Sequence, residues 1–232
     1  FEAAVENDIL LRNPVKKTVK IPQSKKPKKR RVLTVEEQKR FLDVAYGTSN
    51  YNQFAFLLQT GLRTGEMIGL KWSDIDFENR KMRVERSAAW IDGRGFVFGN
   101  TKTESGKREI PLTKEAIEIL KRQKEKNSQN KIVPIQYTDY IFVNSKGLPI
   151  PKYAYNKGIY AACDRAGIRR FSIHLLRHTF ATRCIENGMR PKTLQAILGH
   201  SKIEMTMNLY VHVTEDSKME EMEMIEENLK LV

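Results

Sequence analysis

Apolar residues recur at helical spacing in the segment that begins after residue 32, and clear boundary signals mark its helices. A capping box occupies Thr34 to Glu37, where the Thr hydroxyl and the Glu carboxylate can bind the first amides of a helix that runs to Tyr46. A second helix is expected from Tyr51 to Thr60, with core candidates Phe54, Phe56, Leu57 and Leu58. Gly61 interrupts this helix, and another continues through Glu66 to Leu70.

The middle of the chain changes to a strand pattern. Strands are expected over Lys81 to Ala89, Phe96 to Gly99 and Arg108 to Leu112. Turn residues at Asp92 to Gly95 and at Thr101 to Gly106 separate them. These three segments predict one small antiparallel sheet.

Helical spacing returns at Thr113 and includes Ile117 and Leu120. The stretch from Asn127 to Pro151 reads mostly as loop, with a short strand at Tyr140 to Val143, and the rest is helical from Tyr153 onward. The pattern therefore predicts an α+β fold that is mainly helical and carries a small antiparallel β-sheet.

The first 31 residues differ in character from the remainder of the chain. Glu2 to Arg12 reads as the end of a helix that stops before Pro14, and a basic, proline-containing linker comes next. Either this linker is a solvated connector, or a nuclear-targeting patch, or it lies along phosphates through Lys25, Lys26, Lys28, Lys29, Arg30 and Arg31. Three segments are thus expected: 1–31, a compact domain at 32–214, and a last helix at 215–232.

The charge favours a polyanionic partner. The net charge is +13 and the isoelectric point is near 9.7, which indicates nucleic acid first and an anionic membrane surface second. Charge alone fits a merely basic soluble protein equally well. The last 18 residues, from Glu215, carry −5, which leaves +18 for the rest. No apolar run approaches the roughly 20 residues of a membrane helix, and the start does not read as a signal peptide. Cys163 and Cys184 form no CxxC pair and fit a reducing compartment.

The segment from His174 to Arg177 carries a possible phosphate clamp. Positions i and i+3 share one helix face, so an imidazole and a planar guanidinium would lie side by side. An isolated pair of this kind is more often an ordinary surface pair. His178 could join His174 on a metal ion, but no nearby acid or cysteine completes a ligand set, so no metal site is expected.

Four further residues are weak candidates when each is taken alone. Arg63 comes after a glycine break and could present a second guanidinium, and Lys102 lies at an expected hairpin tip. His200 immediately precedes a capping box at Ser201 to Glu204, so it would lie at the start of a helix. Tyr210 would lie about two and a half turns along that helix. A solvated turn lysine or a packed tyrosine is the ordinary interpretation of such residues.

The order of these motifs resembles the tyrosine recombinase, or phage-type integrase, family. The chain carries TGLRTGE around Arg63, TKT around Lys102, HLLRHTFAT around His174 and Arg177, LGH at His200, and NLYVHV around Tyr210. The match covers roughly Leu33 to Val213, and within the family the chain resembles the integrases of conjugative transposons. As a set these motifs are far more specific than any one of them.

The resemblance implies a role for each residue. Tyr210 would attack a DNA phosphodiester and form a 3′-phosphotyrosine, while Arg63 and Arg177 hold the nonbridging oxygens. Lys102 would protonate the 5′-hydroxyl leaving group, with His174 and His200 assisting. Rejoining would need no ATP, metal ion or other cofactor. The rivals are a type IB topoisomerase, a DNA-binding protein without catalysis and a metal-dependent nuclease.

The resemblance also implies partners. Double-stranded DNA is the expected substrate, in a bacterial, nucleoid-associated setting in the cytoplasm, with accessory DNA-bending proteins as further candidates. The hairpin around Arg94 is longer than in many family members and is a candidate DNA or protein contact. An apolar stripe on the acidic last helix either packs on its own domain or joins protomers into a dimer or tetramer on DNA, through Met219, Met222, Ile225 and Leu229. Only the last helix of an N-terminal core-binding domain is expected within residues 1–31.

Overall fold

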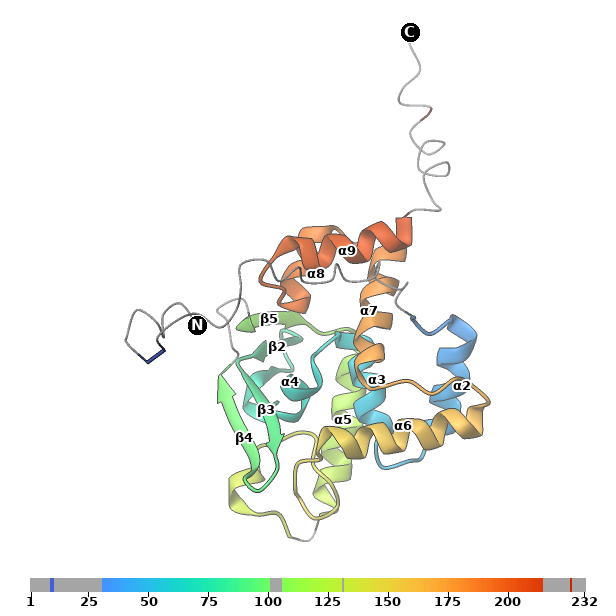
Figure 1. Cartoon of the computed structure of the whole chain (residues 1–232). Coiled ribbons are helices and arrows are strands. Elements are labelled where there is room, and N and C mark those ends of the chain that lie inside the picture. The colour runs from blue at the N-terminus through green and yellow to red at the C-terminus, as the bar shows by residue number, and fades with distance from the viewer. Residues whose placement is uncertain (1–8, 11–30, 101–105, 131, 215–225, 227–232) are drawn as a thin grey trace. The chain divides into compact units, whose positions relative to one another are not determined.

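The computed structural model describes residues 9–10, 31–100, 106–130, 132–214 and 226. The chain divides into two units, Phe1–Arg30 and Arg31–Val232. The second unit contains the helices and strands that Figure 1 labels. No helix among the described residues is long and apolar enough to cross a bilayer.

The first helices form where the capping and glycine signals predict them. Helix α2 (Val35–Ala45) begins at a complete capping box, in which Thr34 accepts from the Glu37 amide and Glu37 accepts from the Thr34 amide. Helix α3 (Tyr51–Thr60) ends at Gly61, whose left-handed backbone (φ +63°) suits glycine. A short helix, α4 (Thr64–Ile68), comes directly after this turn. Both ends of α3 confirm the expected boundaries.

The strands divide into two sheets instead of one. Strands β1 (Ile75–Asp76), β2 (Lys81–Val84) and β5 (Arg108–Pro111) form an antiparallel sheet in the order β1-β2-β5, next to the 3-10 helix η1 (Trp72–Asp74). Strands β3 (Arg86–Ile91) and β4 (Gly95–Asn100) form a separate hairpin. The expected single strand from Lys81 to Ala89 therefore breaks at Glu85. The buried residues Met82, Val84 and Ala88 keep one alternation across the break, so periodicity alone did not reveal it.

The second half of the unit is helical around one long loop. Helix α5 (Lys114–Ser128) is capped by Thr113 and ends before a loop that contains the 3-10 helix η3 (Ile135–Tyr137). Instead of the expected strand at Tyr140 to Val143, two isolated bridges pair Tyr140 with Lys71 and Val143 with Pro149. The chain continues through α6 (Lys152–Ala166), α7 (His174–Glu186), α8 (Pro191–Leu198) and α9 (Ile203–Thr214). Helix α9 thus begins at Ile203 and not directly after His200.

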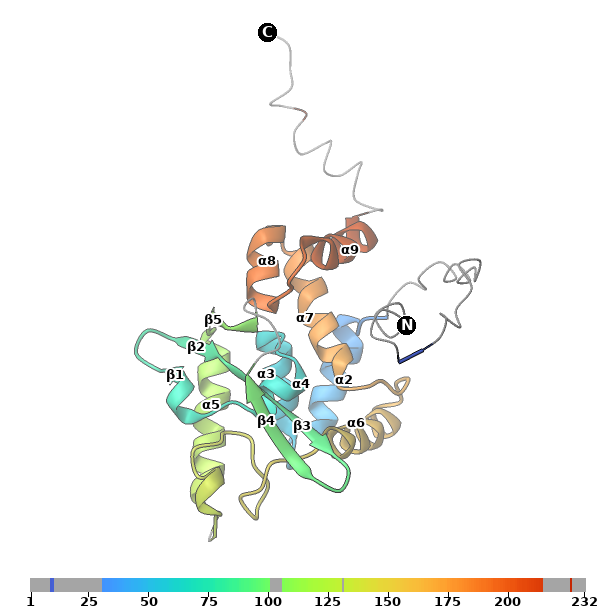
Figure 2. The same ribbon diagram turned by 60° about the vertical axis from the view of Figure 1, so that its left-hand side comes forward.

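Helix α3 forms the centre of the main core and packs against α2, α5 and α7. Its Phe54 and Phe56, with Phe41 and Phe142 from other elements, are completely or almost completely buried. Burial of each such ring contributes roughly 1.5–3 kcal/mol. A second, smaller cluster of Ala181, Ile185, Leu194 and Leu198 joins α7 to α8, with Leu209 and Tyr210 of α9 packed against it. Figure 2 shows α8 and α9 together at one end of α7.

Candidate active site

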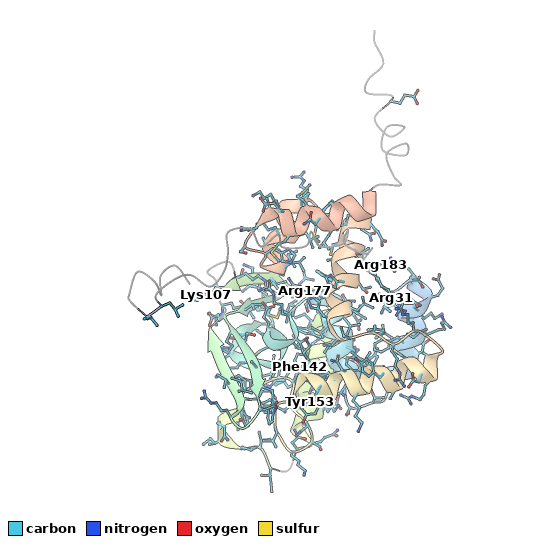
Figure 3. All side chains as sticks on the ribbon, in the orientation of Figure 1. Arg31, Lys107, Phe142, Tyr153, Arg177 and Arg183 are labelled. Atoms are coloured by element: carbon cyan, nitrogen blue, oxygen red, sulfur yellow. The ribbon has the colours of Figure 1, made fainter. Side chains whose placement is uncertain are left out.

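Arg177 is a buried cation that connects three helices. It lies on α7 with 5% of its surface exposed, and Figure 3 labels it within the body of the unit. Its guanidinium donates to the carbonyl oxygen of Gly61 at 2.7 Å and to that of Leu198 at 2.8 Å. Burial, and then the nearby charge of Arg63, lower the pKa of Arg177 to about 9, so the group remains charged at neutral pH.

Arg63 is the more accessible of the two predicted arginines. It is the N-cap residue of α4, and 39% of its side chain is exposed. Its Nη1 donates to Glu66 Oε1 at 2.7 Å, and its Nη2 donates to the carbonyl oxygen of Gly199 at 3.0 Å. The structure therefore brings Arg63 and Arg177 to the same place, although 114 positions separate them in the sequence.

The end of α8 holds these arginines through consecutive carbonyl groups. Arg108 Nε donates to Ile197 at 2.6 Å, Arg177 donates to Leu198, and Arg63 donates to Gly199. The last carbonyls of a helix have no partner within the helix and carry partial negative charge. The helix terminus thus fixes three guanidinium groups that would otherwise repel one another.

Sequence reasoning missed two residues of this cluster, Glu66 and Arg108. Glu66 is 3% exposed and accepts from the Arg63 amide at 2.8 Å as well as from the Arg63 side chain. Arg108 donates to both Glu66 oxygens, at 3.1 and 2.9 Å. Burial alone would raise the pKa of Glu66, but the hydrogen bonds and charges of Arg108 and then Arg63 lower it. The only signal in the sequence was the spacing of Arg63 and Glu66 at i, i+3.

His200 lies beside the cluster and is neutral at physiological pH. Its Nδ1 shares a 2.9 Å hydrogen bond with the hydroxyl of Thr206 on α9, and this bond fixes the orientation of the ring. Burial and the charges of Arg177, Arg63 and Arg108 lower the pKa of His200 to about 4. Gln195 also binds the His200 backbone, from its side-chain amide and through its own carbonyl. His200 can therefore act as a hydrogen-bonding group without adding a fourth positive charge.

The two histidines of α7 lie on either side of Arg177 in the sequence of that helix. His174 is exposed at the first position of α7, while Arg177 is buried. The rings of His174 and His178 contact each other edge to face, with centroids 4.5 Å apart. His178 is close enough to His200 to contribute to lowering the pKa of that residue. Among the described residues no three metal-binding side chains lie together in a way that could hold an ion.

Tyr210 lies on α9 and packs against the smaller core cluster. Its hydroxyl donates a hydrogen bond to the carbonyl oxygen of Met189, in the connection between α7 and α8. Burial, and then the neighbouring Cys184, raise the pKa of Tyr210 above that of an ordinary tyrosine. In this conformation the hydroxyl is bound to the backbone and is not prepared as a phenolate.

The structure describes only some of the other predicted residues. Lys102, and the linker residues 25–30, lie outside the described residues, as do Met219, Met222, Ile225 and Leu229. Arg31 binds Glu37 at 2.6 Å and the Arg169 carbonyl at 2.8 Å, so it anchors the start of the unit, near Arg183 in Figure 3. Arg94 is exposed at the turn of the β3–β4 hairpin.

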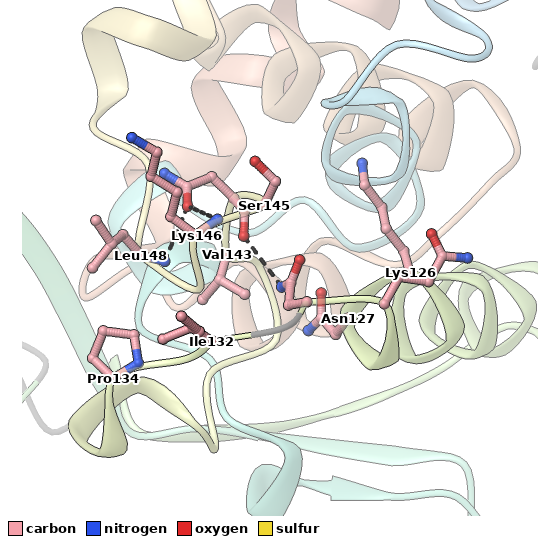
Figure 4. A pocket seen from close by; sticks show the side chains of 11 residues that line it. Lys126, Asn127, Ile132, Pro134, Val143, Ser145, Lys146 and Leu148 are labelled. Carbon is pink, nitrogen blue, oxygen red and sulfur yellow. Dashed lines mark hydrogen bonds between the residues drawn. The ribbon is translucent and has the colours of Figure 1, made fainter.

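The described residues also form a hollow of about 640 Å³ at the end of α5, shown in Figure 4. Its walls come from α5 and the loop after it, and include Lys126, Asn127, Ile132, Pro134 and Leu148. Among the lining residues that the structure describes there is no carboxylate, histidine or tyrosine. This hollow does not share a residue with the arginine cluster.

The fold and the cluster define a class of protein: a mainly helical, basic domain in which three arginines gather at the end of one helix. The chain belongs to the phage integrase family, whose family model matches residues 31–217. The resemblance drawn from the sequence motifs is thereby confirmed, and so is the mainly helical fold with antiparallel strands.

Two curated relatives and one solved structure illustrate the similarity. The chain is 35% identical to the transposase from transposon Tn916 of Enterococcus faecalis, over 96% of this chain and 58% of the relative. It is 30% identical to the ICEBs1 integrase of Bacillus subtilis, over 95% and 60%. The Tn1549 transposon integrase in complex with a circular intermediate DNA matches with a TM-score of 0.79 and 30% identity, over 97% of this chain and 75% of that chain. The chain thus spans less than two thirds of the length of these two curated relatives.

Proposed function

We propose that this chain is the catalytic part of a site-specific DNA recombinase, an integrase of a mobile element that acts through a 3′-phosphotyrosine on Tyr210. The observation that carries the proposal is the convergence of Arg63 and Arg177 on the end of α8, where both guanidinium groups are fixed by backbone carbonyls. A fixed pair of this kind suits the two nonbridging oxygens of one phosphodiester. The similarity to integrases whose structures contain DNA supports the same substrate.

The cleavage step exchanges one phosphoester for another. The Tyr210 oxygen attacks phosphorus, the bond from phosphorus to O5′ breaks, the phenol loses its proton, and the 5′ oxygen gains one. The pKa of Tyr210 is raised in this conformation, so the phenol carries its proton at neutral pH before the attack. The hydroxyl must also leave the Met189 carbonyl to reach a phosphate. The covalent ester keeps the energy of the broken bond, so a second DNA end can reverse the step without ATP.

The remaining residues supply charge and protons. Arg63 and Arg177 stabilise the additional negative charge on the phosphoryl oxygens in the transition state, and Lys102 protonates the 5′ oxygen. His200, held neutral beside the arginines, donates to a phosphate oxygen, and His174 assists with protons or orientation. These side chains supply the cationic charge themselves, so cleavage in EDTA is expected.

The partners are inferred from the same proposal. Double-stranded DNA would be bound by Arg63 and Arg177, by the basic residues 25–31 and by Arg94. Residues 215–232 would join protomers into a dimer or tetramer on DNA. Segments 1–31, 32–214 and 215–232 would be the end of a core-binding domain with its linker, the catalytic domain and the assembly helix. We place this function in a bacterial cytoplasm, at the nucleoid, with accessory DNA-bending proteins as candidate partners.

Covalent trapping tests the proposal. The protein is mixed in EDTA with labelled, nicked duplexes that carry candidate sites from the DNA flanking its gene, then denatured in SDS. A slower band is expected with the wild-type protein and with Tyr153→Phe, which removes an exposed hydroxyl on α6. Tyr210→Phe is expected to bind DNA normally but to give no band. An undiminished band from Tyr210→Phe would refute the nucleophile, and relaxation of supercoiled plasmid without site preference would instead support a topoisomerase.

A further inference from the structure

Arg108 is an arginine of the cluster whose donors are nearly all used inside the protein. Its Nε donates to Ile197, its Nη1 donates to Glu66 Oε1 and to the Gly106 carbonyl at 3.1 Å, and its Nη2 donates to Glu66 Oε2. Only 6% of its side chain is exposed, compared with 39% for Arg63. Arg108 is therefore poorly placed to bind a phosphate itself.

Glu66 connects Arg108 to Arg63. Each Glu66 oxygen accepts one hydrogen bond from Arg108 and one from Arg63, with Arg63 contributing its amide and its Nη1. A carboxylate that accepts from two sides in this way fixes the orientation of both arginines. The Arg63 guanidinium thus has its position defined by a residue that is itself held by Arg108.

Arg108 also determines how much charge the cluster offers. Arg63, Arg108 and Arg177 together with Glu66 carry a net charge of +2. Without Arg108 the net charge falls to +1, and the Glu66 carboxylate would be neutralised by Arg63 alone. Arg63 would then be the sole cationic partner of this carboxylate and a weaker partner for a phosphate.

We propose that Arg108 is a positioning residue for DNA cleavage: by holding Glu66 and the Ile197 carbonyl, it fixes Arg63 and keeps its charge available to the scissile phosphate. This inference rests on the proposed function. It assigns a specific task to the buried contact between β5 and the end of α8, because the Ile197 carbonyl precedes the carbonyls that hold Arg177 and Arg63.

The test compares two substrates that differ in one oxygen. Single-turnover cleavage is measured at saturating protein on nicked duplexes with either a phosphodiester or a methylphosphonate at the scissile position. The methylphosphonate lacks one charged nonbridging oxygen, so it depends less on Arg63. Arg108→Ala is expected to slow phosphodiester cleavage about 100-fold, the size of effect that a misplaced catalytic group produces. The loss on the methylphosphonate should be at least tenfold smaller, whereas a general folding defect would reduce both rates equally.

Two further variants test Arg108. One separates the effect of its geometry from the effect of its charge, and the other tests whether it acts through Arg63. Arg108→Lys keeps the charge but replaces the planar fork with a single point donor, so most of the phosphodiester loss should remain. In an Arg63→Ala background, adding Arg108→Ala should slow phosphodiester cleavage by less than about a further threefold, because the effects of residues that act through one another are not additive. Arg86→Ala, which breaks the ion pair of Arg86 with Asp74 in another part of the unit, is the matched control and should leave the ratio of the two rates unchanged.

The outcomes are distinguishable. Equal losses on both substrates, or full additivity with Arg63→Ala, would overturn the role of Arg108 while leaving the recombinase proposal intact. Absence of a Tyr210-dependent adduct from the wild-type protein would overturn the proposed function and this inference with it. If Arg108→Ala does not fold, as judged by thermal unfolding, the ratio for Arg108→Lys decides.

Discussion

Arg177 donates a hydrogen bond to the carbonyl oxygen of Gly61 at 2.7 Å, and this bond joins the first turn of α7 to the end of α3. Gly61 has a left-handed backbone, which turns its carbonyl out of the helix direction. An added Cβ at this position would lie 2.3 Å from Cδ1 of Phe180, a neighbour of Arg177 on α7. The glycine is therefore required both by the backbone and by the close approach of α7.

Gly61→Ala is expected to lower the free energy of unfolding by about 2–5 kcal/mol, because it combines left-handed strain with overpacking. Gly167→Ala is the matched control. Gly167 ends α6 with a similar φ of +62°, but an added Cβ there would meet no atom within 4 Å. Gly167→Ala should lower the free energy of unfolding by the backbone strain alone, about 1–2 kcal/mol. Urea unfolding of both variants measures the difference, and equal losses would show that the contact with Phe180 carries no cost.

Glu66→Gln should destabilise the protein in a pH-dependent way. The pKa of Glu66 is lowered in the folded state from an unfolded value near 4.5, so its charge stabilises the fold above pH 4.5. That contribution is lost as the pH falls through the folded pKa. At pH 7 the loss should be about 3–5 kcal/mol, the usual result of removing one partner of a buried pair. The difference between wild type and variant should shrink below pH 4.5.

The control for the free energy of unfolding measured against pH is Glu109→Gln. Glu109 pairs with Lys81 on the surface of the β1-β2-β5 sheet, where both side chains are about half exposed. Its removal should change the free energy of unfolding little at any pH. A Glu66→Gln difference that stays constant from pH 7 to pH 3 would show that the Glu66 charge is not what stabilises the cluster.

His200 should titrate well below an ordinary histidine in the protein without DNA. Burial and the neighbouring arginines lower its pKa from 6.5 to about 4. Its contribution to stability is therefore complete above pH 6.5 and is lost as the pH falls from 6.5 towards 4. NMR titration of the ring, assigned with His200→Gln, measures this directly. A bound phosphodiester would offset the arginine charge and raise the pKa; a midpoint at or above 6.5 without DNA would contradict the expected environment.

The sequence predicted the parts of the fold that local signals determine. The capping box at Thr34 indicated the start of α2. Gly61 indicated the end of α3 and the sharp turn that follows it. The break between β2 and β3 could not be predicted in this way, because the alternation of buried residues continues across Glu85. The two sheets are separated by the choice of partner strand, which is a long-range property.

The candidate site shows the same division between local and long-range information. Motif order identified Arg63, Arg177 and His200, and the structure brings these three together. Arg108 was predicted only as part of a strand, because its partners Glu66 and Ile197 lie 42 and 89 positions away. The orientation of Tyr210 towards Met189 likewise depends on how α9 packs against α7 and α8, which no local pattern records.

A chain that ends at Thr214 tests the proposed assembly helix. If residues 215–232 join protomers, this truncation should leave binding to a single site intact but abolish the larger complexes on DNA. The physical reason is the apolar stripe on an acidic segment, which needs a surface to cover it. Gel filtration with light scattering of the DNA complexes measures the change. Unchanged complexes would indicate that the segment does not link protomers.

Lys102→Ala should slow single-turnover cleavage by about 10²–10⁴-fold, the usual contribution of a general acid. The reason is that the departing 5′ oxygen is a poor leaving group unless it is protonated as the bond breaks. A substrate with a 5′-bridging sulfur needs no such proton, so its cleavage rate should be almost the same with and without Lys102. Lys107→Ala, which removes an exposed lysine close to it in sequence, is the matched control for loss of positive charge and should leave both rates nearly unchanged. If the sulfur substrate is slowed by Lys102→Ala as much as the ordinary one, Lys102 contributes charge or binding and another group protonates the leaving oxygen.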